Sequence, residues 1–301
     1  MENKAQPTDE CRFSVELTVD DSSPDLEPVK PEKPRLAWLI VDFTCLLVVG
    51  LVCLLFKLVA VPYHRGFYCD DDSINKPYKE STVPSSVLYS VGFALAYLVI
   101  CVTELCSQRR HKRSSEYSEY VPFKWLKLKP NHINLINLLV SFAFGGLVTI
   151  FVTDIGKYTV GRLRPHFLSI CQAPSSVFLN CSHTYITDDV CTGDPGLLRE
   201  GRLSFPSGHA SFSAYAVTFT ILYMEIMINF PHSRFLKFSL QLLIAQLCVL
   251  CGLSRISDYK HHWSDVLTGL LLGSLIAVLM IDRVLGMFHK GKGTSKHDSQ
   301  G

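Results

Sequence analysis

Three short polar segments of the chain contain the residue types that bind phosphate and cleave its esters. They are Lys157 to Pro165, Pro206 to His209, and Ser254 to Asp265. Each lies next to a hydrophobic run, and together they hold lysine, arginine, histidine and aspartate. Arginine and lysine bind phosphate oxygens, and histidine exchanges protons near neutral pH. The set therefore indicates a site for a phosphate group.

The first segment places two cations on either side of a glycine. We expect a helix to continue to Pro165, so that Lys157, Gly161 and Arg164 lie on one face at i, i+4 and i+7. Arg164 can then bind an anion with its planar fork, while Lys157 supplies a point charge. Arg162 is expected to point away, to the surface. Seen alone, these cations are better explained as anchors of a helix end among lipid headgroups.

The second segment precedes a hydrophobic run and has the composition of a helix start. Backbone N–H groups at such a start can bind an anion, and Gly208 lets the backbone approach it closely. Ser207 can cap the helix or donate its hydroxyl to phosphate, and His209 can protonate a leaving oxygen. By itself, the tetrapeptide is somewhat better explained as an ordinary capped helix with an interfacial histidine.

The third segment joins the last two hydrophobic runs and supplies Arg255, His261 and Asp265. Because His261 and Asp265 are four residues apart at a helix start, we expect the carboxylate to accept the imidazole N–H. That bond would fix the tautomer and leave the other ring nitrogen free to attack phosphorus. His262 is interpreted as structural, and residues 258–260 as part of a turn. Each segment has such an ordinary explanation, but three together on one membrane face favour a single phosphate site.

The three polar segments lie next to long hydrophobic blocks. Hydrophobic residues make up 48% of the chain and its mean hydropathy is +0.22, although both ends are polar, so the apolar residues must be concentrated. A helix needs about 20 apolar residues to cross a hydrocarbon core of about 30 Å. Six blocks approach or exceed this length, the fifth being the shortest: Leu36–Val61, Val87–Cys106, Asn134–Ile155, Ala210–Phe230, Ser239–Leu253 and Val266–Leu285. The predicted fold class is an all-α integral membrane protein with six transmembrane helices.

Lysine and arginine in the connecting loops predict the orientation of the chain. They cluster before the first block, between the second and third, between the fourth and fifth, and after the sixth. Such clusters favour the cytoplasmic side. Both termini are therefore expected in the cytoplasm and the three polar segments outside. The expected domains are a disordered tail at 1–35, a six-span domain at 36–285 and a flexible tail at 286–301.

Other residues give weaker signals. Asn180 begins a glycosylation sequon on the side expected to be outside. Four cysteines lie on that side: Cys69, Cys171, Cys181 and Cys191. They allow three disulfide pairings, and the sequence does not choose among these. Cys248 and Cys251 resemble a redox pair but are interpreted as packing residues of an apolar helix. The apolar blocks also contain acids with no assigned role: Asp42, Glu104, Asp154 and Glu225. Asp154 precedes Lys157 by three residues and is a candidate partner for it.

Taken together, the three segments match the three signatures of the type 2 phosphatidate phosphatase superfamily: Lys157-x6-Arg164-Pro165, Pro206-Ser207-Gly208-His209 and Ser254-Arg255-x5-His261-x3-Asp265. The chain resembles a lipid phosphate phosphatase, also called a phospholipid phosphatase, over roughly Leu36 to Asp282. The runs from Tyr63 to Cys69 and from Gly161 to Leu168 also resemble the animal membrane branch. The resemblance implies a catalytic helical core of the phosphatidate phosphatase and haloperoxidase type.

The resemblance also implies a role for each matched residue. His261 attacks phosphorus to form a phosphohistidine, Asp265 orients it, and His209 protonates the departing lipid oxygen and then activates water. The other site residues hold the phosphate oxygens: Lys157, Arg164, Ser207, Gly208 and Arg255. The implied enzyme is a Mg²⁺-independent phosphatidate phosphatase that uses no cofactor or metal. The outer loops likewise show no carboxylate cluster at metal-ligand spacing.

The implied substrates are phosphate monoesters of lipids: phosphatidate, lysophosphatidate, sphingosine 1-phosphate and ceramide 1-phosphate. The sequence does not choose among them. We expect a plasma-membrane protein with an extracellular site, an endomembrane such as the endoplasmic reticulum being the alternative. The formal charge of +2 gives no indication of nucleic acid as a partner, and homo-oligomer formation stays open.

Other functions make different demands on the same residues. A non-catalytic lipid-phosphate-binding or adhesion protein would need cations such as Arg164 but not the pair of His261 and Asp265. Phosphotransfer to a second alcohol shares every residue and differs only in the acceptor. Vanadate-dependent peroxidases use a similar pocket, but they are soluble proteins. A protein with six membrane spans is therefore not expected to carry out their chemistry. An anion transporter would need a polar relay at the membrane midplane, and none is apparent in the sequence.

Overall fold

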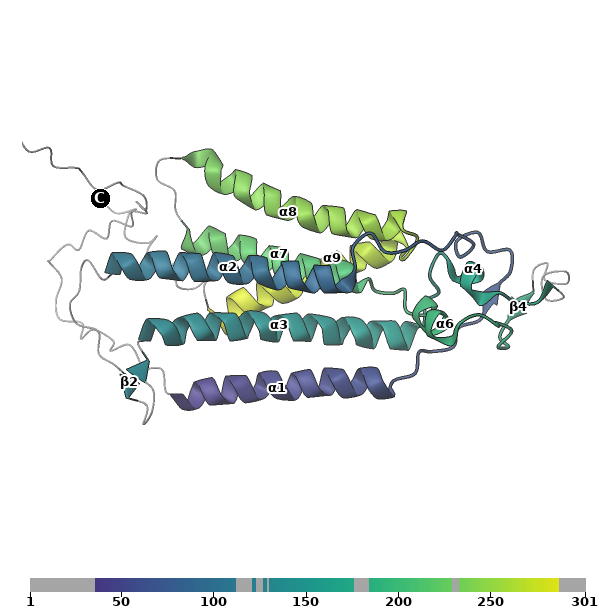
Figure 1. Cartoon of the computed structure of the whole chain (residues 1–301), viewed down its shortest axis with the longest axis horizontal. Coiled ribbons are helices and arrows are strands. Elements are labelled where there is room, and N and C mark those ends of the chain that lie inside the picture. The colour runs from purple at the N-terminus through teal and green to yellow at the C-terminus, as the bar shows by residue number, and fades with distance from the viewer. Residues whose placement is uncertain are drawn as a thin grey trace, which may run out of the picture.

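The structure of the protein is a computed structural model that describes residues 36–111, 121–122, 127–128, 130–175, 184–228 and 233–286. The predicted tail at 1–35, nearly all of that at 286–301, and Asn180 lie outside these residues. In the described part, long helices run side by side in an elongated bundle (Figure 1). They are α1 (Leu36–Val59), α2 (Ser85–His111), α3 (Pro130–Val160), α7 (Gly208–Met227), α8 (Arg234–Ser257) and α9 (Trp263–Leu279).

All six helices are long and apolar enough to cross a membrane, which confirms the predicted all-α membrane fold. α8 is longer at both ends than the predicted block Ser239–Leu253. Its first turn contains the charged residues Arg234 and Lys237 and is capped by the Ser233 side chain, which accepts the Leu236 N–H. Hydropathy by itself therefore underestimated this helix. A π-helical turn, η1 (Met280–Val284), continues α9.

α7 is the centre of the bundle. Of its most apolar stretch, 67% is buried inside the protein, compared with 6% for α1. α2, α3, α8 and α9 all pack against α7, whereas α1 packs against α3 at the edge. Aromatic rings fill the space between α7 and α3, and the Tyr215 hydroxyl donates to the Phe142 carbonyl at 2.7 Å. Cys248 and Cys251 are free and buried, as expected of packing residues.

Two glycines let α9 pack unusually close to α7. Gly269 and Gly273 are four residues apart and so share one face of α9. A Cβ at Gly269 would lie 2.6 Å from the Ser207 carbonyl oxygen, and one at Gly273 would overlap the Ser211 carbonyl. Small residues at this spacing allow helix backbones to approach each other within a membrane. The contact brings the first turns of the two helices together.

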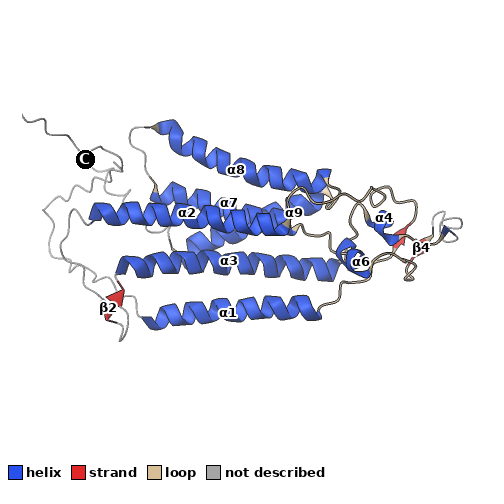
Figure 2. Cartoon of the chain, in the orientation of Figure 1, coloured by secondary structure: helices blue, strands red, loops and turns tan. Residues whose placement is uncertain are grey.

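Short elements form a cap over one end of the bundle, at the right in Figures 1 and 2. They are α4 (Phe167–Cys171), α6 (Pro195–Gly201) and the antiparallel pair of β1 (Phe67–Tyr68) with β4 (Tyr185–Ile186). Phe67 and Phe167 pack edge to face in the small apolar core of this cap. A second antiparallel pair, β2 (Val121–Pro122) with β3 (Lys127–Leu128), lies at the opposite end. None of these short elements was predicted.

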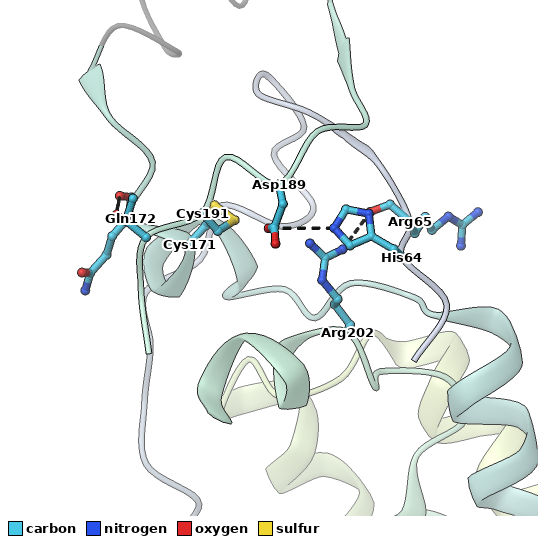
Figure 3. The surroundings of a disulfide bond; sticks show 8 residues. His64, Arg65, Cys171, Gln172, Asp189, Cys191 and Arg202 are labelled. Carbon is cyan, nitrogen blue, oxygen red and sulfur yellow. Dashed lines mark hydrogen bonds and ion pairs between the residues drawn. A yellow bond between two sulfur atoms is a disulfide. The ribbon is translucent and has the colours of Figure 1, made fainter. Parts of the chain in front are cut away.

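Covalent and polar contacts hold the cap together. Cys171 at the end of α4 forms a disulfide with Cys191, so the structure selects this pairing among those that the sequence left open (Figure 3). Close to it, Arg202 donates from Nη1 to the Arg65 carbonyl at 3.0 Å. The segment after α1 is thereby tied to the segment that enters α7.

The substitution Gly273→Ala is expected to destabilise the protein. Its Cβ would overlap backbone atoms of α7, and overpacking of this kind costs roughly 1–3 kcal/mol. Thermal unfolding in detergent micelles would measure the loss. Gly146→Ala is the matched control, because a Cβ there comes no closer than 3.5 Å to any neighbour. An equal melting temperature for the two variants would contradict the close α7–α9 contact.

Candidate active site

The first polar segment is divided between a helix end and a loop. α3 ends at Val160, and Gly161 adopts a left-handed conformation with φ of 57°, as is common just after a helix. A side chain there would overlap the Tyr63 carbonyl. The prediction that the helix continues to Pro165 was therefore wrong. Lys157 lies on the last turn of α3, and Arg164 comes from the loop that follows.

The Asp265 carboxylate lies where the three segments meet, and it is fully buried. Its Oδ1 accepts from Arg162 Nη1 at 2.5 Å. Its Oδ2 accepts from the Ser204 hydroxyl at 2.6 Å and from the backbone N–H of His262 at 3.0 Å. The prediction that Arg162 points to the surface was wrong, because its guanidinium is needed to balance a buried charge. One side chain therefore accepts from the first and third segments and from Ser204, two residues before the second.

His261 is oriented by a main-chain oxygen. Its Nδ1 lies 2.7 Å from the Ser204 carbonyl but 4.0 Å from Asp265 Oδ2, so the predicted direct bond to Asp265 was wrong. The spacing misled because α9 begins only at Trp263, so His261 lies before the helix. Asp265 still acts on His261 through Ser204, whose hydroxyl it binds.

This contact decides which nitrogen of His261 is free. A carbonyl can only accept, so Nδ1 carries the proton and Nε2 keeps a lone pair in the neutral ring. Burial, followed by the positive charges of Arg164 and Lys157, holds the pKa of His261 well below its usual value. The imidazole is therefore neutral at physiological pH. A neutral ring with a free Nε2 is the form that can attack phosphorus.

The start of α7 faces Lys157, as the predicted anion site requires. A Cβ at Gly208 would lie 3.0 Å from Lys157 Nζ, so the cation and this backbone are close. The Ser207 side chain caps α7 by accepting the Ala210 N–H. The backbone N–H of Ser207 donates to the backbone carbonyl of Asp265 at 3.0 Å. The hydroxyl can still donate its hydrogen to another group.

Arg164 is buried, and its guanidinium nitrogens differ in their surroundings. Nη1 donates to Glu200 Oε1 at 2.7 Å, whereas Nε is buried with no hydrogen-bond partner within the described residues. Burial acts to raise the pKa of Glu200, but the charge of Arg164 and its hydrogen bond outweigh this and lower it. Glu200, at the end of α6, thus stays ionised and fixes the guanidinium. No motif in the sequence indicated this residue.

Arg255 is held from behind by polar groups. Its Nε and Nη2 donate to the Ser254 hydroxyl at 3.1 and 3.0 Å, and Nη2 lies 3.0 Å from Asp258 Oδ2. Asp258 in turn accepts from the backbone N–H and the hydroxyl of Thr82 at 2.8 and 2.7 Å. Asp258, which the sequence indicated only as a turn residue, therefore links Arg255 to the segment before α2.

The same segment orients His209. Its Nε2 lies 3.0 Å from the Val83 carbonyl, so Nε2 carries the proton and Nδ1 is the nitrogen left for proton exchange. His209 and His261 lie close enough that the charge of His209 contributes to the lowered pKa of His261. The structure thus brings together the two histidines that the sequence singled out.

Two further side chains near Arg164 were missed by the sequence pattern. His166 donates from Nδ1 to the Tyr259 carbonyl at 2.7 Å, and burial lowers its pKa to about 4. Lys260 lies over the Tyr78 ring with its Nζ 3.9 Å from the centroid, and burial followed by the charge of Arg164 lowers its pKa. Lys260 was expected to be only a turn residue. Lys260 thus adds positive charge near Arg164, whereas His166 is a neutral ring.

Three of the four acids within the spans pair with neighbours on other helices. Asp154 lies 3.3 Å from Lys57 Nζ and 3.9 Å from Lys157 Nζ, so α1 supplies the nearer partner. Glu104 on α2 accepts from the Tyr223 hydroxyl at 3.0 Å. Glu225 on α7 lies 3.0 Å from Lys237 on α8. These pairs compensate acidic groups between helices, and that of Asp154 also includes the site residue Lys157.

Comparison with known proteins defines the class. Residues 134–285 match the PAP2 superfamily. Phospholipid phosphatase 1 of Rattus norvegicus is 38% identical over 260 residues, which cover 85% of this chain and 88% of the relative. Phospholipid phosphatase 2 of Homo sapiens is 36% identical over 257 residues, covering 84% and 85%. The chain therefore belongs to the phospholipid phosphatase family of the PAP2 superfamily. No solved structure gives a significant match.

We expect Glu200→Gln to weaken phosphate binding, because the neutral amide holds Arg164 less firmly. KM for a phosphate monoester should rise about five-fold with a smaller change in kcat, since the acceptor of this hydrogen bond loses its charge. Steady-state kinetics of the detergent-solubilised enzyme would show the split. Glu225→Gln is the control, because Glu225 also pairs with a cation but on the other end of α7. A lower KM for Glu200→Gln would show instead that Glu200 competes with substrate for Arg164.

Proposed function

We propose that the protein hydrolyses phosphate monoesters of lipids through a phosphohistidine on His261. The observation that carries the proposal is the state of this ring, which is buried, neutral, and fixed through Nδ1 with Nε2 free. A purely binding protein gains nothing from a neutral imidazole beside Arg164 and Lys157, since a second charged group would hold phosphate better. A nucleophile needs that neutral form.

The reaction proceeds in two steps. His209 takes up a second proton, at Nδ1, when the anionic phosphate binds beside it. Nε2 of His261 attacks phosphorus, the bond between phosphorus and the lipid oxygen breaks, and His209 gives the Nδ1 proton to that oxygen. His209, now neutral, takes a proton from water as the water oxygen attacks phosphorus. The bond between phosphorus and Nε2 then breaks, which releases inorganic phosphate and restores both histidines. Asp265 stabilises the positive charge that develops on His261, acting across the Ser204 peptide.

The cations hold the phosphate and its developing charge. Arg164 offers its unpaired Nε, and Lys157 and Arg255 approach from α3 and α8. The first turn of α7 adds the Gly208 N–H and the Ser207 hydroxyl. Because these donors are fixed before substrate binds, they stabilise the transition state without reorganisation. No metal ion is needed in this scheme.

The substrates are inferred from the relatives and from the position of the site. The relatives are named phospholipid phosphatases, and the residues proposed to act lie at the ends of membrane-spanning helices. We therefore assign phosphatidate, lysophosphatidate, sphingosine 1-phosphate and ceramide 1-phosphate as the substrate class. The loop charges favour an extracellular or luminal site, with the plasma membrane as the expected location.

We expect His261→Ala to abolish hydrolysis of lysophosphatidate, by about a thousand-fold or more, because the nucleophile is removed. The assay measures phosphate release by purified protein with EDTA present throughout. His132→Ala is the control, since His132 is exposed near the far end of α3. Rapid quenching with radiolabelled substrate should trap an acid-labile, alkali-stable phosphoenzyme in the unaltered protein and in His132→Ala, but not in His261→Ala.

Three outcomes would overturn the proposal. Turnover retained by His261→Ala would remove the assigned nucleophile. Full dependence on a divalent cation, seen as complete loss of activity in EDTA, would remove the assigned role of the fixed cations. Binding of lysophosphatidate without any phosphate release would leave a non-catalytic lipid-binding protein.

A further inference from the structure

A cavity of about 770 Å³ lies between α2, α7 and α8. Its walls are almost entirely apolar, and they include Val87 and Val91 of α2, Val217 of α7, and Leu247 and Leu250 of α8. The reaction proposed above uses no residue of these walls. The volume is within the range of binding sites for small organic molecules, about 300–1,000 Å³.

The cavity is open toward the hydrocarbon of the bilayer. α2 and α8 pack on α7 but make almost no contact with each other within the described residues. The wall residues along this gap keep much of their surface exposed, 49% for Val91 and 62% for Leu250. All three helices are apolar enough to span a membrane. Lipid chains, rather than water, therefore have access to this opening.

The polar end of the cavity is also the edge of the active site. Val83 lines it, and the Val83 carbonyl is the partner of His209 Nε2. Ser254 lines it as well, and its hydroxyl binds Arg255. The cavity thus begins beside His209, the residue that we assign to the leaving oxygen. From there it runs along α2 from Val87 to Leu95, a distance of about 12 Å at the helical rise.

We propose that this cavity binds the hydrocarbon chain of the lipid phosphate and so aligns the ester oxygen with His209. This inference rests on the proposed function. A long, apolar cavity open to the bilayer suits a single straight chain better than a bulky ring system. Because a lipid chain already lies in hydrocarbon, it gains no hydrophobic free energy by entering. The cavity therefore acts through shape and orientation, and it selects for chain length at the transition state.

Filling the cavity tests this. Val91→Trp on α2 and Leu247→Trp on α8 place an indole in the cavity from opposite sides. Leu98→Trp and Leu243→Trp are the controls, because these leucines are exposed on the same two helices outside the cavity. Substrates are oleoyl lysophosphatidate, hexanoyl lysophosphatidate and phenyl phosphate, assayed with each variant in the same detergent.

The filled variants should lose about ten-fold or more in kcat/KM for the oleoyl substrate and keep that for phenyl phosphate within about two-fold. Hexanoyl lysophosphatidate should fall between them, and the controls should match the unaltered protein. Retained phenyl phosphate turnover also shows that a variant is folded and that its catalytic groups are intact. Equal loss for all three substrates, or no loss for the oleoyl substrate, would overturn the assignment of the cavity.

A second measurement does not depend on the variants. Lysophosphatidate with a photoreactive diazirine in its chain should crosslink the unaltered protein within 247–257 of α8 or 87–95 of α2. Crosslinking confined to α1 or α3 would overturn the proposal. Failure of the proposed function would differ from both results, because the unaltered protein would then release no phosphate from any of the three substrates.

Discussion

The buried carboxylate of Asp265 is the interaction on which the rest of the site depends. An ionised group without access to water is strongly destabilising unless donors surround it. Here the donors are Arg162 from the loop after α3, Ser204 from the segment before α7, and the N–H of His262 at the start of α9. A shift of any one segment would leave the charge uncompensated. Three stretches of chain that are distant in sequence are therefore held in one fixed arrangement.

That arrangement is possible only because α7 and α9 pack closely. Gly269 and Gly273 remove the side chains that would separate the two helices, so the Ser207 N–H reaches the Asp265 carbonyl. Close packing deep in the bundle and hydrogen bonding at its polar end thus support each other. The disulfide-linked cap adds α6, and with it Glu200, to the same end. The surroundings of the two histidines are set by helix packing as much as by the loops.

The cations around His261 have two physical effects. They provide a site for an anion, and, together with burial, they keep the imidazole neutral by lowering its pKa. Glu200 and Asp258 each hold one arginine without neutralising the cluster, because Lys157 and Lys260 also contribute positive charge. The segment before α2 joins this arrangement through Thr82 and Val83. The apolar cavity begins at that same segment.

The sequence by itself determined the six helices and the three segments, because block length and residue type are local properties that a bilayer and a phosphate constrain directly. It could not determine which groups bond to one another. Spacing predicted that Asp265 accepts from His261, yet His261 precedes α9 and its partner is the Ser204 carbonyl. Arg162, Glu200 and Lys260 gave no signal, since their partners lie on other elements. Only tertiary packing decided these contacts, because it determines which donors lie within hydrogen-bonding distance of a buried acceptor.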